Sequence, residues 1–579
     1  MAKLMEIATR QDALSSTSQL ELLDSNRSQT WIAGDPAQVV GTTNLYQNGQ
    51  VRCIPMPSPD PKDPLNLPTW RKVAAIVSVC FFGALALSAE TIIGALTPVF
   101  ALEYAGINPM ILGTIDISKL GPPGVVDLNP LKLLAGLGGP PLWKISFLST
   151  LPLLTNGISN YLLVPLSISI GRRPVMLACG VLAWSGGFAA GMSRSLNTHI
   201  AARCVQGVGA GAVEALIPLI VQDLVFIHQR NRAMSSIWAA QGLIIVSIGI
   251  ASPVMVVTPG LGWRTVYFMT AGIAVGAWLS LCFFLPETRW TRSPEELAGK
   301  SVYHLEPGEN RPRLDTNTYS PRTTWTNFGV FQNGFENKQA AKSMLDTLRT
   351  MLFPTVLWVV AINSGFISVQ NAAAQTASSV LIAAGWKFRN LGLAVVPIVV
   401  ATPFVALLGG YVADKVSNAM AKRNGGRREA ETHLINAIFP LLCGIAGCFL
   451  FGYGGQHITT VHWPLLLGGI FLIAVGFLTV NTVLAVYIVE SYPQWAGPVL
   501  VNVSSFRCVV GFAMSFRATT WVEQRGFFGS FAIYAGVLAA LTALLPLFYF
   551  YGKRFRQWTA GTIQNVASSD ERKDSYMDY

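Results

Sequence analysis

Charged residues are scarce in this chain of 579 residues: they make up 12% of it, whereas hydrophobic residues make up 51%. A soluble domain carries roughly 25% charged residues. Too few polar side chains are therefore present to cover a water-facing surface of this size. Because a bilayer is the natural solvent for such an excess of apolar residues, the composition predicts a membrane protein.

Several other patterns are missing. The eight cysteines show no spacing typical of zinc or of a disulfide framework, and the six histidines make no metal-binding pattern. No glycine-rich phosphate loop of Walker type is present, so ATP is not expected as the energy source. The basic residues form short clusters between apolar runs rather than one stripe, which argues against nucleic-acid binding. We therefore expect no metal, no cofactor, no nucleic-acid partner and no enzyme activity.

Long apolar runs dominate what is there. Six of them precede a polar stretch at 286–350 and six follow it, at about 73–99, 143–169, 175–194, 199–225, 235–257, 264–285, 352–374, 391–413, 433–453, 463–488, 498–520 and 529–551. Each is long enough to cross a bilayer as a helix. The sequence predicts an all-α membrane protein with twelve transmembrane helices in two six-helix bundles.

The same pattern divides the chain into five parts. Residues 1–71 are rich in polar residues and proline and predict a disordered cytoplasmic tail without a cleavable signal. The bundles are expected at 72–285 and 351–552, separated by a cytoplasmic loop at 286–350 and followed by a tail at 553–579. A stretch at 101–141, broken by Pro and Gly, is expected to be an extracytoplasmic loop or an error in the gene model.

The distribution of lysine and arginine gives the orientation. With both termini inside, the inner short loops and the C-terminal flank hold twelve basic residues against seven on the other side. Positive charge favours the cytoplasmic side. We therefore expect the central loop and both termini in the cytoplasm.

A loop that carries glycine and charged residues recurs at corresponding places in the two halves. Gly171, Arg172 and Arg173 follow the second apolar run, and Asp414 follows the eighth. Such recurrence indicates parallel repeats. The first loop resembles the G-x-L-x-D-x-x-G-R-R pattern of the major facilitator superfamily, with Ser167 where that pattern has Asp, and the second keeps the acidic residue. The resemblance implies that these loops carry charges that favour one side-open state.

The fourth apolar run supplies a more specific match. Residues 203–211, Arg-Cys-Val-Gln-Gly-Val-Gly-Ala-Gly, resemble the R-x-x-Q-G-x-G-A motif of twelve-span drug:proton antiporters. Segments at 60–72 and 284–290 resemble those of fungal members, and the resemblance covers about residues 60–555. It implies a link between Arg203 and proton coupling. The antiporter motif of the fifth run is diluted, since Pro253 remains but several glycines do not.

Ionisable groups inside the apolar runs are costly to insert and are functional candidates for that reason. A desolvated carboxyl can bind and release a proton near neutral pH. We expect Glu214, near Arg203, to couple to protons, with Glu90 as the next candidate. The alternatives are that Glu214 is a structural hydrogen-bonding partner and that Arg203 reaches the interface.

The seventh run carries amides that could line a substrate cavity. Asn363, Gln370 and Asn371 are the candidates, with Trp358 and Phe366 as apolar walls. The alternative is that these amides bind helices together.

These observations predict a proton-coupled secondary transporter in the plasma membrane, functional as a monomer. Its partners are a small organic substrate such as a drug or secondary metabolite, protons and the bilayer, and we expect efflux by alternating access. Two alternatives remain open: proton-coupled uptake of a nutrient or organic cation, and a non-transporting ligand receptor on the same fold.

Overall fold

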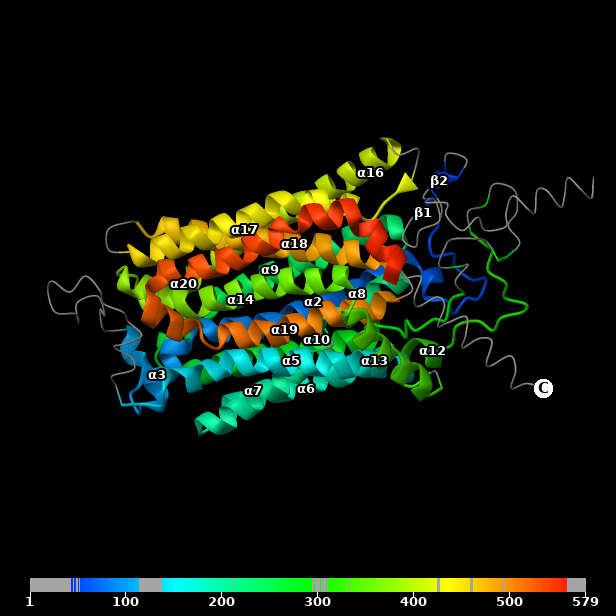
Figure 1. Cartoon of the computed structure of the whole chain (residues 1–579). Coiled ribbons are helices and arrows are strands. Elements are labelled where there is room, and N and C mark those ends of the chain that lie inside the picture. Colours follow the sequence, from blue (N-terminus) through cyan, green and yellow to red (C-terminus); the bar gives the residue numbers. More distant parts are fainter. Residues whose placement is uncertain are drawn as a thin grey trace, which may run out of the picture.

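The computed structural model describes residues 53–113, 138–211, 213–293, 311–332, 334–423, 427–458, 462–492 and 495–559, with short pieces at 43–44, 46–47, 50–51, 296, 302–303 and 309. Long helices run side by side along one axis (Figure 1). The centre of the predicted extracytoplasmic loop, residues 114–137, lies outside the described residues, as does most of both tails.

The first bundle contains six spans. They are α2 (Thr69–Ala95), α5 (Leu142–Ile170), α6 (Arg172–Met192), the pair α7 (Leu196–Ala210) and α8 (Val213–Leu224), α9 (Ile227–Val257) and α10 (Trp263–Phe284). Short helices α3 (Thr97–Tyr104) and η3 (Pro109–Gly113) follow α2 at one end of the bundle. We call the other end, where α5 meets α6, the Gly171 end.

The second bundle contains the other six. They are α14 (Pro354–Ala383), a composite span of η5 (Phe388–Val395), α15 (Val396–Val405), the π-helical η6 (Ala406–Val412) and α16 (Ala413–Arg423), then α17 (Thr432–Gln456), α18 (Pro464–Ser491), α19 (Ala496–Ser515) and α20 (Ala518–Ala543). Within the described chain, eleven helices are long and apolar enough to cross a membrane, and α9 adds a shorter apolar stretch at Gly242–Val257. The predicted fold class is confirmed.

Glycine lets the helices of each bundle approach closely. A Cβ on Gly186 of α6 would stand 2.6 Å from the backbone nitrogen of Gln206 in α7. In the second bundle, a Cβ on Gly469 of α18 would stand 2.7 Å from the backbone nitrogen of Phe451 in α17. Small residues of this kind are the usual means of packing helices in lipid, where no hydrophobic force drives helices together.

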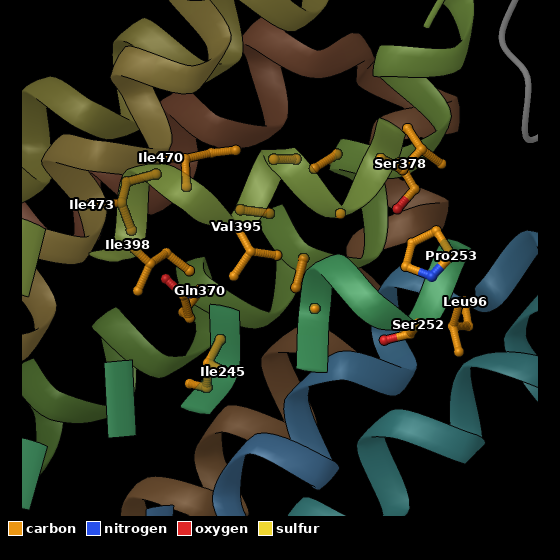
Figure 2. A pocket seen from close by; sticks show the side chains of 17 residues that line it. Leu96, Ile245, Ser252, Pro253, Gln370, Ser378, Val395, Ile398, Ile470 and Ile473 are labelled. Carbon is orange, nitrogen blue, oxygen red and sulfur yellow. The ribbon is translucent and has the colours of Figure 1, made fainter. Parts of the chain in front are cut away.

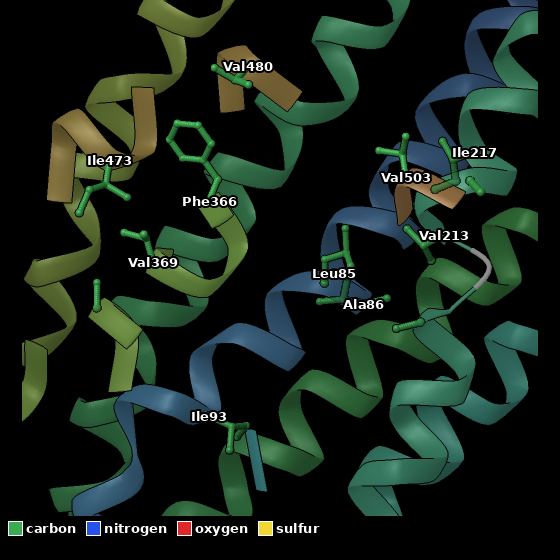
Figure 3. Packing of buried hydrophobic residues seen from close by; sticks show 14 of the residues in the cluster. Leu85, Ala86, Ile93, Val213, Ile217, Phe366, Val369, Ile473, Val480 and Val503 are labelled. Atoms are coloured by element: carbon green, nitrogen blue, oxygen red, sulfur yellow. The ribbon is translucent and has the colours of Figure 1, made fainter. Parts of the chain in front are cut away.

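One apolar core continues through both bundles. Figure 3 shows it passing from Leu85 in α2 to Val369 in α14 and Ile473 in α18. The bundles meet along two seams, α5 against α19 and α9 against η5 and α15. Rings of Phe147 and Phe516 stack at 5.5 Å at the end of the first seam that lies away from Gly171. The bundles are therefore packed together along both seams.

The segment before α2 is folded, in contrast to the predicted disordered tail up to residue 71. Asp63, near η2 (Pro64–Asn66), has no exposed surface and accepts two hydrogen bonds from Arg292, at 2.6 and 3.1 Å. Arg322 donates to the carbonyls of Pro61 and Lys62, both at 2.8 Å. The prediction missed this because it judged polarity alone, whereas Asp63 is satisfied by an arginine that lies more than two hundred residues later.

In the predicted central loop, the described residues include the helices α12 (Thr324–Phe328) and α13 (Asn337–Met351). Helix α13 lies against both α5 and α19. Ser169 of α5 bonds Asn337 at 2.8 Å, and Asn502 of α19 donates to the carbonyl of Thr347 at 2.7 Å. Four two-residue strands complete the described elements: β1 (Thr43–Asn44) pairs with β4 (Arg427–Arg428), and β2 (Tyr46–Gln47) with β3 (Gln50–Val51).

Candidate functional site

The fourth span contains two described helical segments, and Glu214 lies at the beginning of the second. Helix α7 ends at Ala210 and α8 begins at Val213, so Glu214 lies in the first turn of α8. The N-terminal end of a helix carries partial positive charge, which stabilises a carboxylate. Gly211, directly after α7, lies close against α5, because a Cβ there would overlap the hydroxyl of Ser159.

Glu214 forms an ion pair with Arg507 of α19, so the pair joins the two bundles. The side chains are 7% and 3% exposed, respectively. Arg507 also donates to the side-chain oxygen of Asn481 in α18 at 2.7 Å, and the thiol of Cys508 lies 3.7 Å from the Glu214 carboxylate. The Nε atom of Arg507 is buried and has no hydrogen-bond partner among the described residues. A buried carboxylate, a cation with a spare donor and an amide therefore meet between the bundles.

Arg203 lies elsewhere, in contrast to the expectation that it accompanies Glu214. Arg203 lies in α7 and contacts other helices than Glu214, which lies in α8. Arg203 is 1% exposed and donates to the carbonyl of Leu148 in α5 at 3.1 Å, to that of Ala89 in α2 at 3.3 Å, and to Gln206. The guanidinium of Arg203 therefore links α7 to α2 and α5 within the first bundle. Its side chain is buried and does not extend to the membrane–water interface. Glu90 lies in α2, but its side chain is outside the described part of the structure.

An aromatic cluster surrounds a buried histidine one turn before Arg203. His199 has no exposed surface, and its ring nitrogens lie 2.9 Å from the hydroxyl of Tyr104 and 2.8 Å from that of Tyr267. Its ring stacks on Trp263 at 5.2 Å. Burial raises the pKa of Tyr104, which lies in α3 outside the spans, so its hydroxyl stays protonated and can donate. This cluster closes one end of the first bundle.

A cavity of about 80 Å³ lies between α9, α14, η5 and α18 (Figure 2). Its walls are mostly apolar, including Ile245, Val395 and Ile473, and the side chains of Gln370, Ser252 and Ser378 add polar groups. Pockets for drug-sized ligands measure roughly 300–1,000 Å³. The cavity is therefore too small for such a ligand in this arrangement of the bundles.

Of the five residues predicted to line a substrate cavity, Gln370 lines this one. Asn363 is fully buried and donates to the carbonyl of Val359 in its own helix, while Asn371 is partly buried on α14. Trp358 donates to the carbonyl of Leu541 at 2.9 Å and stacks on a phenylalanine of the adjoining helix. Phe366 packs in the core (Figure 3), 1% exposed. The two aromatics thus pack between helices, because α14 contacts neighbours on several sides.

The loop motif at the Gly171 end is built around Glu287. The φ of Gly171 is +110°, and a Cβ there would meet the Glu287 carboxylate, so glycine is required for both reasons. Glu287 accepts from the backbone nitrogens of Arg172 and Arg173, at 3.0 and 3.2 Å. Arg172 forms an ion pair with Asp223 at the end of α8. Arg173 donates to the backbone carbonyls of Cys282, Leu285 and Asn327.

The motif therefore ties α6 to α8 and α10 within one bundle. The loop itself has Ser167 where the family pattern has an acidic residue. Carboxylates reach the loop instead from Asp223, near the end of α8, and from Glu287, just after α10. Asp414 lies in the first turn of α16, at the corresponding place in the second bundle. There, Glu431 and Arg556 form a buried ion pair, with exposed fractions of 4% and 0%.

Sequence reasoning did not connect Arg507 or Asn481 with Glu214. The pairing joins residues almost three hundred positions apart in different bundles, and no local spacing indicates it. The rule that a buried charge needs a partner was the available signal. This rule limits the partner of Glu214 to one of the few arginines within spans, but it does not say which arginine.

Comparisons with known proteins agree with this architecture. The sequence profile of the Major Facilitator Superfamily matches residues 129–516. An uncharacterized MFS-type transporter of Schizosaccharomyces pombe is 22% identical, with 92% of each chain covered. The efflux pump radE of Floropilus chiversii is also 22% identical, over 86% of this chain and 83% of its own.

A solved structure shows the same fold. The xylose transporter XylE of E. coli, in a partially occluded inward-open conformation, superimposes with a TM-score of 0.54 at 14% identity, covering 83% of this chain and 98% of its own. The profile match spans more than half of the sequence, and the helices, seams and loop motif fit it. This chain belongs to the Major Facilitator Superfamily and is a multi-pass membrane transporter of a fungal branch.

Proposed function

We propose that the protein is a proton-coupled exporter of small organic compounds, and that the Glu214–Arg507 pair is its coupling site. The observation that carries this proposal is a buried ion pair that joins the two bundles. An intramembrane carboxylate is a functional candidate because inserting it is costly. We further propose that the protein acts as a monomer in the plasma membrane, with the Gly171 end in the cytoplasm.

Protonation of Glu214 would break the pair in a defined way. The proton neutralises the carboxylate, and Arg507 is then left with Asn481 as its hydrogen-bond partner between packed helices. A buried cation without its counter-ion is strongly destabilised. The bundles can lower this free energy by separating, because water then reaches the guanidinium. Proton binding therefore favours an open state, and release favours the closed one.

The direction of coupling depends on what competes with the proton. A substrate that carries a cation or hydrogen-bond donor would occupy the Glu214 carboxylate, so that proton and substrate exclude each other. Mutually exclusive binding gives exchange, which is export when protons enter. The efflux-pump name of one relative supports this direction.

Proton-coupled uptake is a second candidate, and one observation favours it. The unpartnered Nε of Arg507 offers a donor to an anionic or acceptor-rich substrate. Protonating Glu214 would release Arg507 for such a substrate, so that proton and substrate would bind together and move in the same direction. The charge of the substrate thus determines the sign of coupling at this site.

Flux in reconstituted vesicles under an imposed pH gradient tests the proposal. Glu214→Gln keeps shape and hydrogen bonding but cannot change charge, so it should abolish proton-driven accumulation and spare substrate binding. Glu103→Gln is the matched control, because Glu103 pairs with Arg264 at 3.1 Å within one bundle at a more exposed site. Wild-type pH dependence in the Glu214→Gln protein would remove that residue from the mechanism. Inverting the gradient distinguishes export from uptake.

A further inference from the structure

Helix α13 has its polarity reversed. Its buried positions are Ser343, Thr347 and Thr350, which face α5 and α19. Its outward face carries Leu345, Leu348 and Leu352, which are 47%, 51% and 81% exposed. A helix on a water-soluble surface places hydroxyls outside and leucines inside. The outward face of α13 is therefore adapted to an apolar surrounding.

Basic side chains border this leucine face. Lys338, Lys342 and Arg349 are all exposed on α13, at positions close to the leucines in the helical repeat. Apolar residues on one side and lysine or arginine beside them are typical of helices that lie at the surface of an anionic membrane.

Exposed aromatic residues also lie in the segment just before α13. Trp325, Phe328, Phe331 and Phe335 are 64%, 49%, 56% and 70% exposed. Aromatic rings are enriched at the level of lipid headgroups. A run of this size on a water-facing loop would be an unusually large apolar patch for a soluble surface.

Contacts to the spans place this surface at their ends. The backbone nitrogen of Glu336 donates to the carbonyl of Ser169, one residue before the end of α5, at 3.2 Å. The carbonyl of Asn327 accepts from Arg173 at the start of α6, at 2.6 Å. Helix α13 is followed directly by α14, a membrane span, from Pro354. This segment therefore lies at the ends of the spans, where the surface of a bilayer would be.

We infer that residues 325–352 are a membrane-interface element whose leucines and aromatic rings enter the headgroup region, and whose basic residues bind anionic phospholipid. The occupant of this surface is the bilayer itself. The inference depends on the proposed function only in assigning the element to the cytoplasmic leaflet. Anionic lipids in that leaflet attract clustered lysine and arginine.

The test uses the full chain in lipid nanodiscs, with an environment-sensitive fluorescent amino acid at Leu348. Thr316, an exposed residue of the same loop outside the patch, is the matched control position. Brominated phosphatidylcholine should quench the probe at 348, with a blue-shifted emission, and leave the probe at 316 unchanged. Equal emission and quenching at both positions would overturn the inference. A probe at 348 that is shielded from aqueous iodide but not quenched by bromolipid would reveal a protein cover, which would overturn the inference as well.

The charge component has its own test. Adding phosphatidylserine should increase bromolipid quenching at 348 in the parent protein. The triple variant Lys338→Gln, Lys342→Gln, Arg349→Gln should lose that increase, while Arg313→Gln, an exposed residue paired with Glu309, should keep it. An increase that persists in the triple variant would refute binding of anionic lipid by these residues. Because these readouts do not require transport, their failure is distinguishable from a failure of the proposed function.

Discussion

Replacing Arg507 alone should open the interface between the bundles far more than replacing both members of its pair. Arg507→Met leaves the Glu214 carboxylate buried without its cation. Removing one partner of a buried ion pair costs about 3–5 kcal/mol, whereas replacing both by neutral residues of similar volume is about neutral. Because the pair joins two bundles, we expect this free energy to be lost from the closed state. A loss of about 3 kcal/mol changes the ratio of closed to open protein about 150-fold.

Cys508 is a native reporter of this equilibrium. It has no exposed surface, and its thiol lies 3.7 Å from the Glu214 carboxylate. Its alkylation by a water-soluble thiol reagent therefore requires separation of the bundles. We expect its alkylation rate, measured by peptide mass spectrometry, to rise by about two orders of magnitude in Arg507→Met, in line with the cost of a broken buried pair. Cys448, equally buried within the second bundle, is the control and should react unchanged.

The double variant Arg507→Met, Glu214→Gln should return most of the way to the parent rate. Two residues in contact show non-additive effects, and the difference measures their coupling. If the effects of the two single substitutions simply add in the double variant, the pair does not hold the bundles closed and the argument fails.

Three further predictions concern other parts of the structure. Gly171→Ala should destabilise the protein by about 1–3 kcal/mol, since it places a side chain at a positive φ and against Glu287. A lower midpoint of thermal unfolding would show this. Gly272→Ala is the control, because nothing lies within 4 Å of its new Cβ, and equal midpoints for the two variants would contradict the role of Gly171. Arg203→Lys should slow proton-driven flux by losing bonds to two helix carbonyls, and Arg203→Ala should slow it further; wild-type flux in both would make Arg203 dispensable. A cysteine at Ser320, which accepts a hydrogen bond from Lys62 at 2.6 Å, should resist an impermeant thiol reagent in intact cells, and its labelling would overturn the orientation.

Much of the fold could be predicted because lipid imposes a strong rule. Every backbone group must be satisfied within the span, so apolar length alone identifies helices. The close approach of Gly211 to α5 was not predicted, since Gly211 is a small residue in an apolar run and its neighbour Ser159 comes from another helix. Helix α13 was hidden within a polar stretch for a different reason: its leucines are too few to form a span but suffice for an interface.

The candidate site was predicted in part. Glu214 and Gln370 were selected by the cost of burying polar groups, and the structure places the first between the bundles and the second on a cavity wall. Trp358 and Phe366 pack against neighbouring helices instead, because composition does not tell which side of α14 faces the cavity. Arg203 donates to Gln206 of its own R-x-x-Q motif and to two backbone carbonyls of other helices, and no sequence pattern indicates the carbonyls.

The contact between Asp63 and Arg292 has a consequence for the connectivity of the chain. Asp63 precedes the first span and Arg292 follows the sixth, so this pair fastens the beginning of one half to its end. In the second half, Glu431 before α17, the third span of that half, is joined to Arg556 beyond α20. Each half therefore has a buried ion pair formed by its own residues, and neither pair depends on the linker between the halves. We expect the two halves, divided between α12 and α13, to assemble when expressed as separate polypeptides.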